Sequence, residues 1–145
     1  MSDLKQINLT DRGVIAISGP ETRSFLQGIV TNDVEKVDPT RALYSALLTP
    51  QGKFLFDFFM ADDGDGGLLV DVKRERLAEL AKRLKFYKLR AKAEITDVSD
   101  QFTVTALIGE GAGAASRLHE GAGNARRDGD TVLAVDPRLS DMGVR

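Results

Sequence analysis

Two apolar runs, separated by a short turn-forming tripeptide, dominate the hydrophobic pattern in the middle of the chain. Residues 43–49 form the first run, and residues 53–60 form the second, which has four phenylalanines within six successive positions. The intervening Pro50-Gln51-Gly52 suits a three-residue loop in which proline begins a type I turn and Gly52 adopts a left-handed conformation. The pattern therefore predicts a β-hairpin.

Asp57 does not belong in the apolar second strand of this hairpin. It lies between Phe56 and Phe58 in the sequence. On the predicted strand it shares its face with Leu55 and Phe59. A carboxylate in these surroundings loses water and needs a hydrogen-bond partner or a ligand to offset the cost, which makes Asp57 a candidate functional residue. The alternative is an ordinary ion pair on the sheet surface with Lys53, Lys88 or Arg90.

Shorter apolar runs and amphipathic segments surround the hairpin. Helical spacing of apolar residues occurs at 25–30 and 74–85, and the small residues of 109–123 also indicate a helix. Further strands are expected at residues 14–18, 68–72, 93–98, 102–108 and 131–135. This order predicts the α+β class, with an antiparallel sheet that carries helices packed on one face. A ferredoxin-like element is expected within residues 42–108.

Three polar segments carry weaker signals. Thr31-Asn32-Asp33 can accept backbone N–H bonds and start a short helical turn, so capping is favoured for Asn32 and Asp33, with ligand contact left open. The acidic, glycine-rich residues 62–67 lack the spacing of an EF-hand and indicate a turn. Residues 73–92 contain nine basic residues and two acidic ones. A solvated helix face is the favoured interpretation of this strip, and a surface for an anionic partner, centred on Lys88 and Arg90, is the alternative.

Composition narrows the range of functions. The chain has 145 residues, of which 42% are hydrophobic and 29% charged, as in one ordinary globular domain. It has no cysteine and one histidine, so no metal ligands are assigned and a histidine-dependent hydrolase triad is not expected. The net charge of -2 gives no reason to expect nucleic-acid binding, and no apolar run is long enough to span a membrane. The N-terminal residues show neither a signal nor a transit peptide, which predicts a cytoplasmic protein.

Four blocks of sequence resemble the folate-binding YgfZ family: FLQGIVTNDV, ALYSALLTPQGKFLFDFFM, KFYKLRAKAEITDVS and DPRLSDMGVR. Relatives of that family are the mitochondrial iron–sulphur assembly factors and the glycine-cleavage T protein, an aminomethyltransferase. The resemblance implies that residues 1–145 form a folate-binding region, the N-terminal part of a longer, ring-shaped architecture around tetrahydrofolate. The family's Lys-Gly-Cys-[aromatic]-x-Gly-Gln-Glu signature would follow the last block, beyond these residues.

The resemblance also suggests site residues. Asp57 falls where aminomethyltransferases carry the acid that approaches the folate N10, and Tyr44 where they carry an aromatic residue that lines the pterin pocket. Asn32 and Gly52, within the most similar blocks, are further candidate folate-binding residues. A two-residue hairpin loop would set Tyr44 opposite Asp57, whereas the three-residue loop favoured above would set Ser45 there.

Three functions follow from these considerations. The first is a tetrahydrofolate-binding accessory protein that supports assembly or repair of iron–sulphur clusters in other proteins. The second is a folate-dependent aminomethyltransferase or demethylase in which Asp57 acts on the N10-linked carbon; no catalytic residue is assigned beyond this alternative. The third is a folate-free interaction module that uses the basic strip. Because half a ring exposes apolar surface, a homo-oligomer is also expected.

Overall fold

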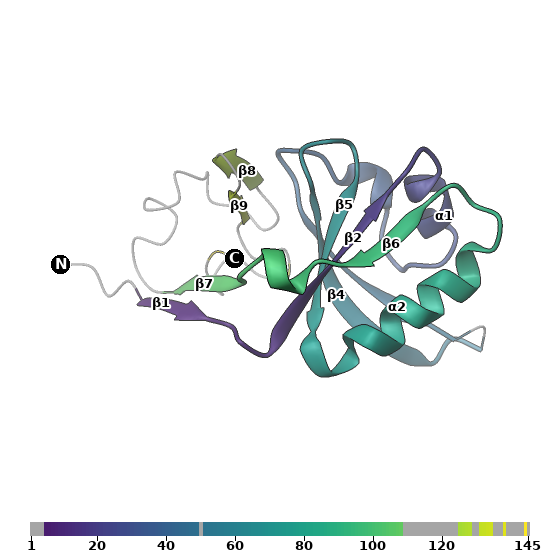
Figure 1. Cartoon of the computed structure of the whole chain (residues 1–145), viewed down its shortest axis with the longest axis horizontal. Coiled ribbons are helices and arrows are strands. Elements are labelled where there is room, and N and C mark those ends of the chain that lie inside the picture. The colour runs from purple at the N-terminus through teal and green to yellow at the C-terminus, as the bar shows by residue number, and fades with distance from the viewer. Residues whose placement is uncertain are drawn as a thin grey trace.

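The structure of the chain, a computed structural model, describes residues 5–49, 51–108, 125–128, 131–134, 138 and 144, and all structural statements concern these. A five-stranded, wholly antiparallel sheet forms its centre (Figure 1). The strand order is β3-β4-β5-β2-β6. The strands are β2 (Arg12–Ser18), β3 (Leu43–Leu48), β4 (Phe54–Asp62), β5 (Leu68–Lys73) and β6 (Glu94–Asp97). The predicted antiparallel sheet is therefore confirmed.

Helices cover one face of this sheet. α2 (Arg74–Lys88) presents Leu77, Leu80 and Leu84 to the strands, and the short α1 (Thr22–Gln27) contributes Leu26. Because side chains alternate along a strand, every second residue of the sheet points into this core. Its members include Ile15, Ile17, Phe56, Phe58, Met60, Val70 and Val72. The predicted α+β class, with helices on one face, is confirmed.

A crossover fixes the order of the strands. β5, α2 and β6 follow one another in the chain, yet β2 lies between β5 and β6 and is antiparallel to both. β5 and β6 are thus parallel to each other, and the unit is the split β-α-β arrangement of ferredoxin-like folds. β5, α2 and β6 lie within residues 42–108, where the sequence predicted a ferredoxin-like element, but β2, which separates the two strands, comes from residues 12–18 outside that range.

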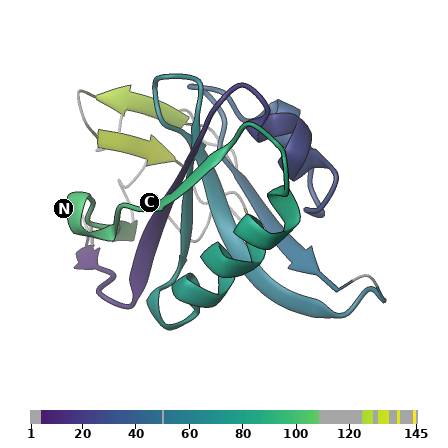
Figure 2. The same ribbon diagram turned by 45° about the vertical axis from the view of Figure 1, so that its right-hand side comes forward.

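Two small sheets lie on the other side of the central sheet. β1 (Lys5–Asn8) pairs with β7 (Thr105–Ile108), and β8 (Ala125–Asp128) pairs with β9 (Thr131–Ala134). Figures 1 and 2 both show β8 and β9 on the side away from α2. β1 and β8 were not predicted, because their sequences, KQIN and ARRD, are polar and four residues long. The helix predicted at 109–123 lies outside the described residues.

The central hairpin has the predicted loop but a different register. Thr49 N–H donates to the Lys53 carbonyl (2.7 Å), Gly52 N–H donates to the Thr49 carbonyl (2.8 Å), and Gly52 has φ +87°. These features confirm a three-residue loop with Gly52 at a positive φ; Pro50 itself lies outside the described residues. The expectation that Ser45 would lie opposite Asp57 is wrong, because Ala46 occupies that position.

A β-bulge at Leu55 causes this difference. Leu47 pairs with Phe56, but the next residue, Leu48, pairs with Phe54, so Leu55 is an extra residue in β4. Leu55 packs against the main core instead of flanking Asp57 as predicted. Its carbonyl accepts a hydrogen bond from the Arg76 guanidinium of α2 (2.9 Å). The bulge therefore has a partner from another element, 21 residues away in sequence.

Candidate functional site

A row of side chains crosses the sheet face that the helices leave open. Tyr44 in β3 lies opposite Phe59 in β4, Phe59 lies opposite Asp71 in β5, and Asp71 lies opposite Val14 in β2. Directly opposite residues of antiparallel strands point to the same face, so these four side chains are neighbours. Phe59 is buried although it points away from the main core. The open face is therefore partly covered by its own aromatic and charged residues.

Asp57 and Tyr44 interact directly on this face. Because Asp57 lies opposite Ala46, it occupies the same face as Tyr44, one diagonal step away. The Tyr44 hydroxyl donates a short hydrogen bond to a carboxylate oxygen (Oδ2) of Asp57. The Tyr44 and Phe59 rings pack with their centroids 5.2 Å apart, which fixes the orientation of the phenol. The bulge at Leu55 thus produces the meeting of the two residues that the family resemblance selected.

The hydrogen bond to Asp57 raises the pKa of Tyr44 above its ordinary value, with desolvation and the negative charge of Asp57 adding to the effect. Nearby Arg138 and Arg12 act in the opposite direction. The cause is that a carboxylate acceptor stabilises the protonated phenol. The Tyr44 hydroxyl consequently keeps its proton at neutral pH and remains a hydrogen-bond donor.

The ion-pair alternative for Asp57 finds no support in the described part of the chain. Ion pairs among the described residues include Arg12–Asp71, Arg23–Asp62, Lys73–Glu75 and Arg76–Glu79, and none of these involves Asp57. Lys88 donates instead to the Ala93 carbonyl (2.8 Å). Tyr44 is thus the hydrogen-bond partner that satisfies Asp57 among the described residues.

Two guanidinium groups lie over the aromatic residues of the row. Arg12 Nε bonds an Asp71 carboxylate oxygen at 2.7 Å, and its guanidinium carbon lies 5.5 Å from the centre of the Phe59 ring. The guanidinium carbon of Arg138 lies 4.8 Å from the Phe59 ring centre and 5.8 Å from that of Tyr44. Such cation–π contacts place positive charge next to the Tyr44–Asp57 pair. The site therefore combines a carboxylate, aromatic faces and cations that can meet an anionic ligand.

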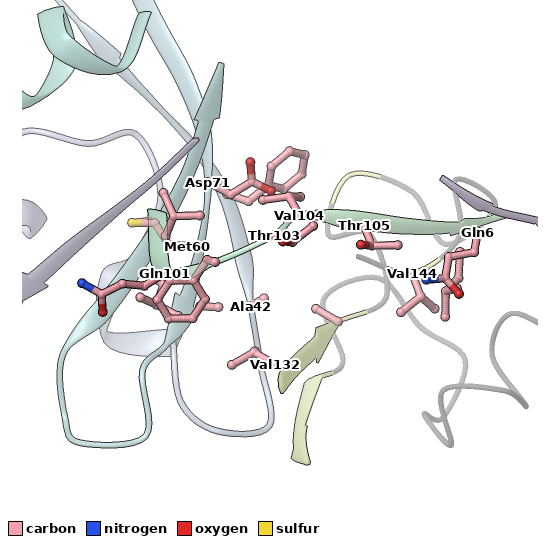
Figure 3. Close-up of a pocket in the computed structure, with 17 residues that line it drawn as sticks. Gln6, Ala42, Met60, Asp71, Gln101, Thr103, Val104, Thr105, Val132 and Val144 are labelled. Atoms are coloured by element: carbon pink, nitrogen blue, oxygen red, sulfur yellow. The ribbon is translucent and has the colours of Figure 1, made fainter. Parts of the chain in front are cut away.

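A cavity of about 520 Å³ adjoins the row. It lies between the open face of the sheet and the segments around β7 and β9, as Figure 3 shows for Met60, Asp71, Thr105 and Val132. Val14, Phe59 and Asp71 belong to both the row and the cavity wall, whereas Tyr44 and Asp57 do not line the cavity and are connected to it through the contact of Tyr44 with Phe59. Its walls are mainly apolar, with Gln6, Asp71, Gln101, Thr103 and Thr105 as polar groups. This size and lining are typical of small-molecule sites.

Sequence similarity assigns the chain to a family. The profile described as "GCVT N-terminal domain" matches residues 4–119. The chain belongs to this GCVT N-terminal domain family. Two fungal proteins, each named "Iron-sulfur cluster assembly factor IBA57 homolog, mitochondrial", are similar over nearly the whole chain. The one from Mycosarcoma maydis is 30% identical, with 99% of this chain and 36% of that protein covered. The one from Neurospora crassa is 31% identical, with 94% and 33% covered.

The chain thus spans about a third of the length of these curated relatives. A solved structure agrees on the fold: the glycine cleavage system aminomethyltransferase T from Bartonella henselae superposes with a TM-score of 0.75 at 15% identity, covering 92% of this chain and 38% of that one. At this identity the match establishes the fold alone. The predicted correspondence with the N-terminal part of the aminomethyltransferase fold is confirmed.

Asn32 of the GCVT domain lies next to the Tyr44–Asp57 pair and is hydrogen-bonded to Tyr44 and Ser45 in β3. Its side-chain amide donates to the Tyr44 carbonyl (3.0 Å), and its backbone N–H donates to the buried Ser45 hydroxyl (3.1 Å). Its side-chain oxygen accepts from Asp33 N–H, and Asp33 caps the 3₁₀ turn Val34–Lys36. The capping interpretation is confirmed for Asp33, whereas the Asn32 side chain bonds the Tyr44 carbonyl and the Asp33 N–H and caps no helical turn. A direct folate contact by Asn32 stays a prediction.

Gly52 is not brought to the Tyr44–Asp57 pair. It lies in the hairpin loop, and no atom lies within 4 Å of where a side chain would begin. Its observed contribution is the positive φ that the turn requires. A role for Gly52 in folate binding stays a prediction.

Phe59, Asp71, Arg12 and Arg138 are site residues that the sequence did not single out. Asp71 gave the same signal as Asp57, a carboxylate within an apolar strand, LLVDVK.

The acidic loop at 62–67 is a turn, as predicted: the Asp62 and Asp63 side chains accept hydrogen bonds from the backbone N–H groups of Gly64, Asp65 and Gly67. Across the described residues, no group of three or more His, Cys, Asp or Glu residues could hold a metal ion. None of the described helices has the length and hydrophobicity to cross a membrane.

Proposed function

We propose that residues 1–145 are the folate-binding, N-terminal region of an accessory protein that supports iron–sulphur cluster assembly or repair in other proteins. The observation that carries the proposal is the Tyr44–Asp57 pair on the open face of a GCVT-family domain, beside a cavity of about 520 Å³. The assembly role in the proposal comes from the similar fungal proteins, which are named as iron–sulphur cluster assembly factors.

The residues present fit a reduced folate. Reduced folates carry a pterin with N–H donors, an aromatic linker and glutamate carboxylates. The Asp57 carboxylate can accept from an N–H group, and the half-buried Tyr44 ring can pack against the ligand. The guanidinium groups of Arg138 and Arg12 add positive charge near this pair, and Arg12 is itself paired with Asp71. Bound tetrahydrofolate would serve as a carrier of one-carbon units, and the residues here bind and orient it.

The test has two parts. Tetrahydrofolate titrated calorimetrically into the gene product that contains this chain should bind with 1:1 stoichiometry; absence of binding contradicts the folate assignment. Deletion of the gene should lower the activities of iron–sulphur enzymes under oxidative stress, and unchanged activities contradict the assembly role. Turnover of an aminomethyl or N-methyl substrate by the purified protein would instead establish the one-carbon transfer enzyme. The cytoplasmic location stays a prediction, and the fungal relatives carry mitochondrial names.

A further inference from the structure

The C-terminal end of α2 carries a cluster of basic and apolar side chains that the folate site does not use. We call it the basic–apolar patch, and its members are Lys82, Arg83, Lys85, Phe86, Leu89 and Arg90. Phe86 is 71% exposed and Leu89 is 79% exposed, the two highest values among the exposed large hydrophobic residues described. Lys82 and Arg83 lie beside Phe86, because residues three or four apart on a helix are neighbours. No acidic residue occurs in the sequence between Glu79 and Glu94.

Leu89 is held outward by an unusual backbone conformation. Its φ is 46° and its ψ is −104°, and it is the only non-glycine residue with positive φ in the part of the chain that the structure describes. Ala91 N–H donates to the Lys88 carbonyl (2.7 Å), which closes a turn around Leu89. These features match the first central position of a type II′ turn, where glycine is normally found. The chain thus keeps a large apolar side chain in solvent at a position where glycine would relieve strain.

We propose that the basic–apolar patch is a docking surface for an acidic protein segment that also carries apolar side chains. Its cations would pair with the partner's carboxylates, while Phe86 and Leu89 would be covered by apolar groups of the partner. Aromatic and arginine side chains inside a polar rim are the usual energetic centres of protein interfaces, which suits Phe86 with Arg83 and Arg90. Backbone strain at Leu89 is the kind of feature that concentrates at functional sites.

A membrane and a second copy of the chain fit the patch less well. The apolar stripe of α2, Leu77, Leu80 and Leu84, is buried against the sheet, so this helix cannot turn an apolar face into a bilayer. In a symmetric dimer through this patch, cations of one copy would face cations of the other. Charge complementarity therefore favours an acidic protein partner.

The docking surface is separate from the candidate folate site. α2 covers the face of the sheet opposite to the one that carries Tyr44 and Asp57, and Figure 2 shows α2 on the side away from β8 and β9. A partner held at the end of α2 would leave the open face accessible. The proposal does not depend on folate binding, and the assay below contains no folate.

The test measures binding of a fluorescein-labelled peptide of alternating Asp and Leu residues by anisotropy, with an Asp–Ser peptide of equal charge beside it. We expect the Asp–Leu peptide to bind more tightly and its affinity to fall as salt is raised. Leu89→Gly should weaken its binding about tenfold while leaving the melting temperature unchanged or higher. Phe86→Ser, and the double change Lys82→Glu with Lys85→Glu, should each weaken binding at least as much.

Matched controls come from the same chain. Phe54→Ser removes another exposed phenylalanine, at the hairpin, which is 62% exposed. Lys36→Glu with Lys53→Glu makes the same change of net charge at exposed positions elsewhere. Both controls should bind like the parent chain. The proposal is overturned by no binding of the Asp–Leu peptide, by equal losses in controls and patch variants, or by unchanged binding in Leu89→Gly. Tighter binding to phosphatidylserine vesicles or to single-stranded RNA than to the peptide would also overturn it.

Discussion

Tyr44 and Asp57 are hydrogen-bonded because β4 contains one residue more than β3 between the hairpin loop and the Ala46–Asp57 register pair. A regular ladder from the three-residue loop would place Ser45 opposite Asp57, and Asp57 would then point to the face opposite from Tyr44. The extra residue, Leu55, shifts the register and brings both side chains to the open face. The geometry of the candidate site thus depends on a bulge outside it.

Asp57→Asn tests the role of the carboxylate in folate binding. The change removes the charge and one strong acceptor but keeps the shape of the side chain. We expect tetrahydrofolate affinity to fall by about 1.5–3 kcal/mol, the scale of a hydrogen bond to a charged group. The melting temperature should change little, because the position is only half-buried. Calorimetric titration and a thermal melt, with Asp65→Asn in the exposed turn as control, check both points. Equal affinities would remove Asp57 from the site.

Tyr44→Phe tests the hydrogen bond through its dependence on pH. Deleting the hydroxyl should cost about 1 kcal/mol of stability at neutral pH. The folded-state pKa of Tyr44 is raised above 10.0, so the native state keeps this proton when the unfolded chain loses it. The extra stability is therefore fully present below pH 10 and is lost as pH rises through the folded-state value. Urea unfolding of both proteins at several pH values measures it. A difference between the two proteins that grows above pH 10 would contradict the assignment.

Arg76→Met tests the support of the bulge. Arg76 donates to the Leu55 carbonyl, and its guanidinium carbon lies 4.5 Å from the centre of the Phe56 ring. Methionine keeps most of the packing but leaves the carbonyl without this donor, which should cost about 1–3 kcal/mol. Folate affinity should fall as well, because the register that joins Tyr44 to Asp57 is loosened. Lys82→Met, on an exposed part of the same helix, is the control. Unchanged stability would show that the bulge persists without Arg76.

Gly52→Ala and Gly19→Ala separate backbone strain from close packing. Both glycines have positive φ, but a side chain at Gly52 meets open space, whereas one at Gly19 would lie 2.4 Å from the Lys92 carbonyl oxygen. Gly52→Ala should cost about 1–2 kcal/mol from strain alone, and Gly19→Ala should cost more. Denaturant unfolding gives the order. Folate titration of Gly52→Ala adds a second result, because unchanged affinity would limit Gly52 to the turn.

The sequence revealed those parts of the site whose signal comes from residues close together in the chain. Asp57 was identifiable because a carboxylate in an apolar strand is costly without a partner, and the loop was identifiable from Pro50 and Gly52. The register was not, because the bulge is held by Arg76, a residue on a helix that the strand pattern does not include. Arg12 and Arg138 escaped notice for a related reason: each reaches the aromatic rings of β3 and β4 from a distant part of the chain.

The place of β2 in the sheet determines when the domain can be completed during synthesis. β2 leaves the ribosome early, but its neighbours are β5 and β6, and Ile15 faces Asp97 across the β2–β6 ladder. The hairpin partners β3 and β4 can pair as soon as they emerge, whereas β2 must wait for strands made much later, and such distant pairings form slowly. During that interval its apolar residues and unpaired backbone are open to other chains. A nascent chain halted before Glu94 would leave one edge of β2 without its strand, and one halted before Leu68 would leave both edges open, so the shorter fragments should bind chaperones more strongly.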